Sequence, residues 1–279
     1  MSPITSQGLP KYDKPPVIEV VCGILFRSIE DLLAPHLGLL WEKFRPEYST
    51  CQEVPPIAPT IEHFEDSPQQ VQLQFSNKPP LPRIWFLHPD GSIIQVQRDR
   101  FLYNWKKMRP EDKYPHYSEV VEKFKNHLSS FQGFLKEQEL GVVEPLQYEM
   151  TYVNLIPEGE AWQTTSDTGA VFPDFTWQPK SPRGDAQRFL SPPEGINWRT
   201  SFVLPNNMGR LHVHIQKGQL RENGQQVFRF ELTARGIGKN KSLEAMPNWF
   251  DFAHESIVRG FADLTGYQVQ RDVWKLSEG

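Results

Sequence analysis

The chain has 279 residues, enough for one large domain or two smaller ones, and either could bury a hydrophobic core. Its 30 Lys and Arg against 34 Asp and Glu give a formal net charge of -4, which excludes an overall attraction for nucleic acid or an anionic membrane. The two cysteines, Cys22 and Cys51, are too few for a disulfide framework. No apolar run is long enough for a signal peptide or a transmembrane helix, so we expect a soluble, cytoplasmic protein.

The first half of the sequence contains two kinds of hydrophobic pattern. Near-continuous or alternating apolar runs predict strands, and apolar residues repeated every three or four positions predict amphipathic helices. A His-Pro-Asp-Gly turn at 88–91 predicts a hairpin between two of the strands. In chain order, these patterns predict a strand at 17–28, a helix at 30–45, strands at 71–75, 83–87 and 92–97, and a long helix at 117–139.

The second half repeats this order of elements. A Pro-, Gly-, Ser- and Thr-rich connection at 157–196 takes the place of the first helix, and a connection of that length is commonly functional or mobile. The predicted elements are a strand at 146–156, strands near 198–204, 209–216 and 226–235, and a helix at 247–264.

The segregation of strands and long helices predicts an α+β protein, with antiparallel sheets and the long helices packed together on one side. We divide the chain into an N-terminal half, 1–143, and a C-terminal half, 144–279, with a long insertion near 157–196. The relation between the halves is inferred from element order, because residue identity between them is slight. The side chains predicted to form the core are Trp85, Phe101, Trp105, Phe124, Phe131, Phe230, Phe250, Ile257 and Phe261.

Several short motifs are spread over nearly the whole chain. They are "KPPVIEVVCGILF" at 14–26, "WF" at 85–86, "QVQRDRFLYNW" at 95–105, "YPHY" at 114–117, "TYVN" at 151–154, "ELTARG" at 231–236 and "WFDFAHESIVRGFADLT" at 249–265. In these motifs the chain resembles an uncharacterised, sporadically distributed bacterial protein family of unknown function, although that family's usual Asn before the first proline pair is Lys14 here. The resemblance implies a bacterial, cytoplasmic protein and names no chemistry.

Strand alternation predicts a polar sheet face opposite the helices. Amide, imidazole and guanidinium groups suit directional recognition of a ligand or partner, and a plain solvated face is the alternative. The aromatic residues of the 157–196 connection could cover this face or simply attach the connection to the body. The residues turned outward are Gln72, Gln74, Gln95, Gln97, His212, His214, Arg229 and Glu231, and the aromatic residues are Trp162, Phe172, Phe175 and Trp177.

The outward histidines raise the question of a metal site. His212 and His214 point the same way on one strand, and Glu231 or Glu149 could supply a third ligand. However, no H-E-x-x-H, C-x-x-C or nucleophile motif occurs, so we predict no metal and no cofactor, and enzymatic activity is not favoured. His254, beside the core stripe of the last helix, is interpreted as structural.

The segment from 97 to 109 combines basic and aromatic residues. An unbroken strand would bury two arginines on the helix side, so a bulge or bend near Asp99 is predicted, which turns Phe101, Tyr103 and Trp105 toward the core. The basic residues then form either a rim that binds single-stranded nucleic acid or a structural corner paired to nearby acids. These residues are Arg98, Arg100, Lys106, Lys107 and Arg109.

Three functions are therefore considered. The first is a non-enzymatic binding or regulatory protein that uses the polar face for a protein partner or small ligand. The second is a nucleic-acid-associated protein that uses the basic rim and a saddle-like sheet, and the third is a metal-dependent hydrolase at His212 and His214. Only the first needs no motif that the sequence lacks.

Overall fold

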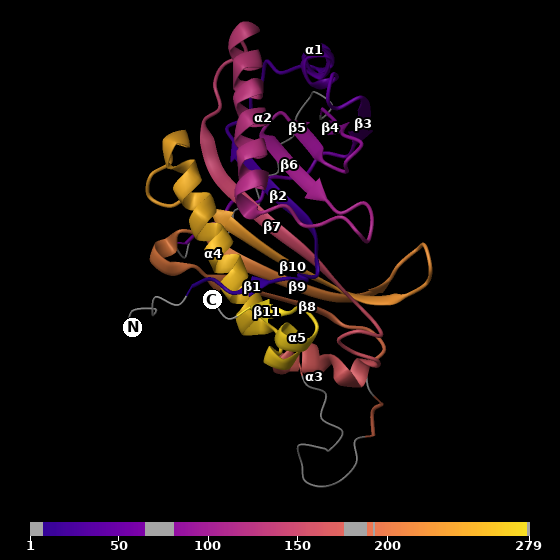
Figure 1. Cartoon of the computed structure of the whole chain (residues 1–279). Helices are drawn as coiled ribbons and strands as arrows, with labels where there is room; N and C mark the ends of the chain where they lie inside the picture. The colour runs from indigo at the N-terminus through magenta and orange to yellow at the C-terminus, as the bar shows by residue number, and fades with distance from the viewer. Residues whose placement is uncertain (1–7, 65–80, 176–188, 192, 278–279) are drawn as a thin grey trace.

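The computed structural model describes residues 8–64, 81–175, 189–191 and 193–277, and it contains one large antiparallel sheet of nine strands. The strand order is β3-β4-β5-β6-β2-β7-β10-β9-β8, with helices on one face (Figure 1). The strands of this sheet are β2 (Val17–Phe26), β3 (Thr50–Val54), β4 (Arg83–Leu87), β5 (Ile93–Gln97), β6 (Arg100–Lys106), β7 (Pro145–Pro157), β8 (Asn197–Val203), β9 (Arg210–Gln219) and β10 (Gln226–Gly236). The α+β class and the antiparallel sheet are confirmed.

A small ribbon and five α-helices complete the described fold. In the ribbon, β1 (Lys11–Tyr12) pairs with β11 (Leu276–Ser277). The helices are α1 (Ala34–Phe44), α2 (Tyr117–Glu137), α3 (Thr168–Val171), α4 (Met246–Leu264) and α5 (Tyr267–Asp272). In the described residues, no helix is long and apolar enough to cross a membrane.

The two halves of the chain meet at the centre of the sheet, where β2 pairs with β7. Counted outward from that pair, the first half contributes β2, β6, β5, β4 and β3, and the second contributes β7, β10, β9 and β8. In each half, the strand that comes last in the chain lies next to the strand that comes first: β6 beside β2, and β10 beside β7. The strand order is therefore mirrored about the central pair. Both strands of the pair are apolar on the helix side because alternate residues of a strand share a face.

The long helices cover one face of the sheet, as predicted. α2 packs on β2 and β6, and α4 packs on β7 and β10. The two helices also contact each other, because the rings of Phe124 and Phe250 lie 5.3 Å apart between centroids. α1 belongs to the same layer, since the ring of Phe44 stacks on that of Phe86 in β4.

The predicted bend near Asp99 is a tight hairpin. Gln97 pairs with Arg100, so Arg98 and Asp99 form the turn between β5 and β6. This turn changes which residues face the helices, and Phe101, Tyr103 and Trp105 are buried as expected.

One expectation, the burial of Trp85 in the core, is wrong, and another, a strand at 71–75, lies outside the described residues. Trp85 was predicted in the core, but β4 buries Ile84 and Phe86 on the helix side and leaves Trp85 half-buried on the polar face. An aromatic strand residue fits either face when its N–H finds a partner, and here Trp85 donates to Gln95. The strand predicted at 71–75 lies outside the described residues, and β3 was not predicted.

Replacing Phe250 with alanine tests the contact between the two helices. The side chain is 0% exposed and packs against Phe124, Tyr148 and Trp249, so we expect the free energy of unfolding to fall by about 3–5 kcal/mol. Urea unfolding measures this change. Phe189→Ala removes the same side chain where it is 98% exposed and should change stability by less than about 0.5 kcal/mol. Equal effects of the two substitutions would contradict this helix packing.

Candidate functional site

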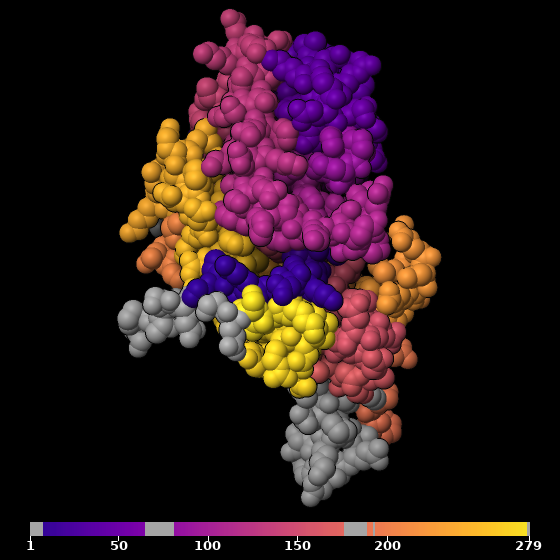
Figure 2. Space-filling view, viewed as in Figure 1, coloured from indigo at the N-terminus to yellow at the C-terminus, as the bar shows by residue number. Residues whose placement is uncertain are grey.

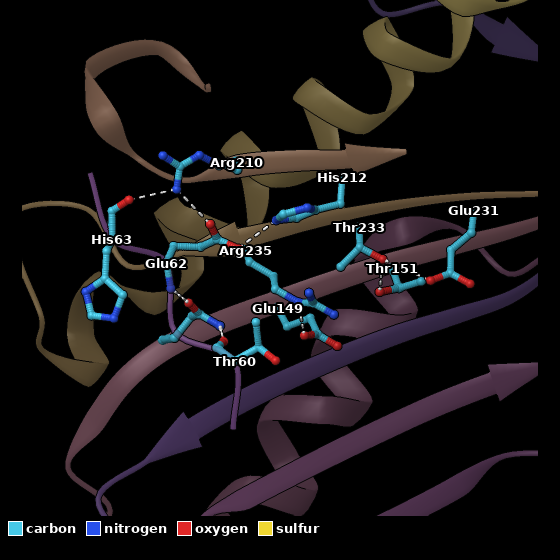
Figure 3. Close-up of polar contacts among 11 residues, drawn as sticks. Thr60, Glu62, His63, Glu149, Thr151, Arg210, His212, Glu231, Thr233 and Arg235 are labelled. Atoms are coloured by element: carbon cyan, nitrogen blue, oxygen red, sulfur yellow. Dashed lines mark hydrogen bonds and ion pairs between the residues drawn. The ribbon is translucent and has the colours of Figure 1, made fainter. Parts of the chain in front are cut away.

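The face of the sheet opposite the helices is polar, and its second half is the candidate site (Figure 3). Cross-strand pairing arranges its side chains in rows, because residues opposite each other on neighbouring strands share a face. Arg210 of β9 is opposite Arg235 of β10, which is opposite Glu149 of β7. The next rows hold His212, Thr233 and Thr151, then His214 and Glu231.

A segment from the first half crosses this face. Residues 57–64, here called the strap, follow β3 and contact side chains on β5, β7 and β9. Strands in a sheet lie about 4.8 Å apart, so the five steps from β5 to β9 span about 24 Å. An extended chain covers about 3.4 Å per residue, so the strap must be nearly extended to make these contacts.

Two glutamines of the sheet hold the backbone of the strap. Gln97 accepts a hydrogen bond from the Ile57 N–H (2.8 Å) and donates one to the Ile57 carbonyl (2.9 Å). Gln147 accepts from the Glu62 N–H (2.8 Å) and donates to the Thr60 carbonyl (2.8 Å). Each side-chain amide offers one donor and one acceptor, so it makes the two hydrogen bonds to the strap backbone that a neighbouring strand would otherwise make.

Near its C-terminal end, the strap carries a carboxylate, Glu62, that is bound by two basic side chains. Glu62 Oε1 lies 2.6 Å from His212 Nε2, and Arg210 donates to Glu62 Oε2 (3.0 Å) and to the His63 carbonyl (2.8 Å) (Figure 3). The guanidinium also lies 4.7 Å from the centre of the Phe64 ring. The Glu62 side chain is 8% exposed, and although burial raises its pKa, the bonds from His212 and Arg210 outweigh burial and lower the pKa overall.

Beyond the strap, the face continues as a series of paired polar groups. Arg235 donates to Glu149 Oε2 (2.6 Å), the hydroxyls of Thr151 and Thr233 lie 2.8 Å apart, and Arg229 forms an ion pair with Glu231. This part of the surface has both signs of charge and both donors and acceptors. It can therefore receive a polar backbone or a mixed-charge side-chain pattern.

The predicted surface residues lie on this face but have different surroundings. His212 binds the strap, whereas His214 Nε2 lies 3.0 Å from the Asn197 side chain, toward the sheet edge at β8. Gln95 and Gln97 are buried, Gln97 beneath the strap and Gln95 in bonds with Arg83, Trp85 and Asn104. Gln72 and Gln74 lie outside the described residues.

The other two predicted sites, a metal site and a basic rim, stay predictions. Among residues that the structure describes, no group of three or more His, Cys, Asp or Glu side chains could hold a metal ion. The basic residues lie at opposite ends of β6, because Arg98 and Arg100 are at its start and Lys106, Lys107 and Arg109 at or beyond its end. Arg100 is buried on the polar face, and the Arg98 side chain bonds the Leu32 carbonyl (3.3 Å).

The 157–196 connection lies on the helix side in its described part. Trp162 and Phe172 are buried against Phe228, and Phe172 also contacts Phe230. Phe175 packs on Trp198, whose partner across the strands is the buried Ile215. These aromatics attach the connection to the core and do not cover the polar face, and Trp177 lies outside the described residues. The strap, from the first half, covers part of the polar face instead.

Sequence reasoning missed several residues of the site, among them Glu62, Gln147 and Arg210. Gln147 and Arg210 lie within the predicted strands at 146–156 and 209–216, and strand alternation alone places both on the polar face. Glu62 could not be found in this way, because the strap has no hydrophobic period and its partners are up to 150 residues away.

A second polar cluster lies on the helix side, in an open cleft of about 1140 Å³. The Tyr114 and Tyr152 hydroxyls lie 2.8 Å apart, Tyr152 lies 3.0 Å from His254 Nδ1, and the ring of His254 stacks on Tyr117 at 4.0 Å. Figure 2 shows the first described residues lying across this side, between the segment before α2 and the C-terminal residues. Burial lowers the pKa of His254 to about 4, so the imidazole is neutral near pH 7.

Comparison of the chain with models of known protein families, with curated proteins and with solved structures finds no match. The resemblance drawn from the short motifs therefore stays a prediction, and the function must be argued from the geometry of the chain itself.

Gln147→Ala tests how the strap is held. The substitution leaves the Thr60 carbonyl and the Glu62 N–H without their partner, which should lower the local opening free energy of the strap by about 1–3 kcal/mol. Hydrogen exchange of residues 57–62 should become faster. Gln216→Ala removes an exposed glutamine of β9 and should leave this exchange unchanged. Protection that survives Gln147→Ala would mean that the amide does not hold the strap.

His254 should make stability depend on pH. Its pKa is about 4 in the folded chain and about 6.5 unfolded, so its contribution is complete above pH 6.5 and is lost as the pH falls toward 4. The loss should reach up to about 3 kcal/mol, since one pKa unit corresponds to about 1.4 kcal/mol. In His254→Gln, the free energy of unfolding, measured with urea at several pH values, should depend less steeply on pH in this interval. The exposed His116→Gln should keep the slope, and identical slopes in all three chains would contradict the assignment.

Proposed function

We propose that the protein is a non-enzymatic binding or regulatory protein that holds an extended segment of a protein partner on its polar sheet face. The observation that carries the proposal is the way this face holds the strap. Side-chain amides on β5 and β7 bond the backbone, and a basic pair on β9 bonds one carboxylate. These are the contacts by which an extended peptide is recognised, with backbone bonds for affinity and one side chain for specificity.

The length of the connection that carries the strap supports this role. The connection between β3 and β4 runs from 55 to 82, although these two strands are direct antiparallel neighbours that a few residues could join. Loops of this length in a compact protein are uncommon and are often functional. The strap leaves Ile61 and Phe64 exposed, so its attachment depends on polar contacts and not on burial of its apolar side chains.

The surface beyond the strap gives room for a longer partner segment. Glu149, Thr151, Glu231 and His214 continue the polar face toward β8. β8 is a sheet edge with mostly exposed residues, and edge strands offer unpaired backbone groups to a partner.

A peptide added in trans tests the proposal. We expect a labelled peptide of residues 55–64 to bind the full chain carrying Glu62→Ala, whose own strap lacks its carboxylate anchor. Binding to the unchanged chain should be at least about tenfold weaker, because its tethered strap competes at a high effective concentration. Fluorescence anisotropy measures both affinities.

The matched control is the same peptide with alanine at the position of Glu62, which should bind poorly. Adding Arg210→Ala to the Glu62→Ala chain should also abolish binding, since the carboxylate then loses a partner. Absence of binding to the Glu62→Ala chain, with that chain folded, would rule out peptide recognition by this face.

A further inference from the structure

Two arginines on the polar face lie on either side of β5. Gln97 of β5 pairs with Arg100 of β6, and Val96 pairs with Ile84, the neighbour of Arg83 on β4. Arg83 and Arg100 are therefore separated by one strand, with Cα atoms about 10 Å apart. Two arginine side chains can reach a common point across that distance.

Arg100 is buried and Arg83 is half-buried, and in the described part of the chain both guanidinium groups lack some of their hydrogen bonds. Arg100 is 7% exposed, and the one side-chain hydrogen bond that it makes to a described residue, the Ala58 carbonyl of the strap, is long at 3.5 Å. Arg83 donates to Gln95 (2.8 Å) and lies over the Trp85 ring. The Nε atom of each arginine is shielded from solvent and finds no hydrogen-bond partner among the residues that the structure describes. A buried donor without a partner is costly, so each Nε marks a place where an acceptor would stabilise the protein.

Within the described residues, the positive charges of these two arginines are only partly balanced. Within the described part of the chain, neither guanidinium forms an ion pair with a carboxylate. Asp99 is the nearby acid: burial raises its pKa overall, the charge of Arg100 opposes that shift, and its carboxylate accepts a hydrogen bond from Gln97 (2.8 Å). Burial and the charge of Arg100 lower the pKa of Arg83, so the nearness of Arg100 disfavours the charge of Arg83.

We propose that Arg83 and Arg100 form a binding site for a phosphate group. A phosphate dianion balances two positive charges and accepts hydrogen bonds from both guanidinium groups at once. The strap backbone at Ala58 lies beside Arg100, so the site suits a small group, either inorganic phosphate or the end of a phosphate ester. The site is separate from the carboxylate pocket at Arg210 and does not depend on the proposed peptide binding.

Calorimetric titration of the full chain with inorganic phosphate, at constant ionic strength in chloride, tests the site. We expect saturable binding of one phosphate, weakened by about tenfold or more in Arg83→Gln and in Arg100→Gln, since each removes a charge-assisted partner. Arg221→Gln removes an exposed arginine outside the site and should bind like the unchanged chain. Circular dichroism shows whether each variant folds. If one of Arg83→Gln and Arg100→Gln does not fold, the phosphate affinity of the other tests the site.

A second titration distinguishes the sources of phosphate. Acetyl-Gly-phosphoSer-Gly-amide should bind more tightly than inorganic phosphate if the group belongs to a phosphorylated side chain, and more weakly if the free ion is the ligand. Either result supports the site, provided that the arginine variants weaken it. No saturable binding of either compound, or equal binding in all three arginine variants, would overturn the proposal.

Discussion

The pairing of β2 with β7 is the interaction on which the rest of the structure depends. It joins four strands of one half to five of the other in a single sheet, so each face of the molecule is continuous from β3 to β8. On the helix side, α2 and α4 can then share one hydrophobic core across the joint. On the polar side, a segment of the first half can reach side chains of the second. Without this pairing, each half would expose the hydrogen-bonding edge of a central, largely buried strand.

Buried groups are stabilised in different ways on the two faces of the sheet. The helix side excludes water with aromatic and aliphatic side chains, whose packing needs no directional partner. The polar side is also partly buried, by the strap, and there nearly every buried group must be hydrogen-bonded. The series of hydrogen bonds from Trp85 through Gln95 to Asn104 and Glu19 shows this requirement being met. Unmet requirements on such a face are therefore informative, because they are rare in folded proteins.

Much of the fold follows from local sequence, and much of the site does not. The alternation in 226–235 and the helical spacing in 117–139 each depend only on neighbouring residues, and the structure places a strand and a helix there. Trp85 was assigned to the wrong face because aromatic character says nothing about which side offers a partner to the indole N–H. The His212 and His214 side chains point as strand parity predicts. The partner of His212, Glu62, comes from a segment without any periodic pattern. The relation of the halves by duplication stays a prediction, since only the order of strands supports it.

The strap also has a consequence for the order of folding. Its contacts join residues that are 40, 85 and 148 positions apart, so most of them cannot form until β7 and β9 are in place. Closing such long loops is slow compared with forming a hairpin such as β5–β6. During synthesis from the N-terminus, residues 57–64 emerge well before their partners on β7 and β9. For that interval the chain carries an unattached segment, and its attachment completes only when the second half has folded.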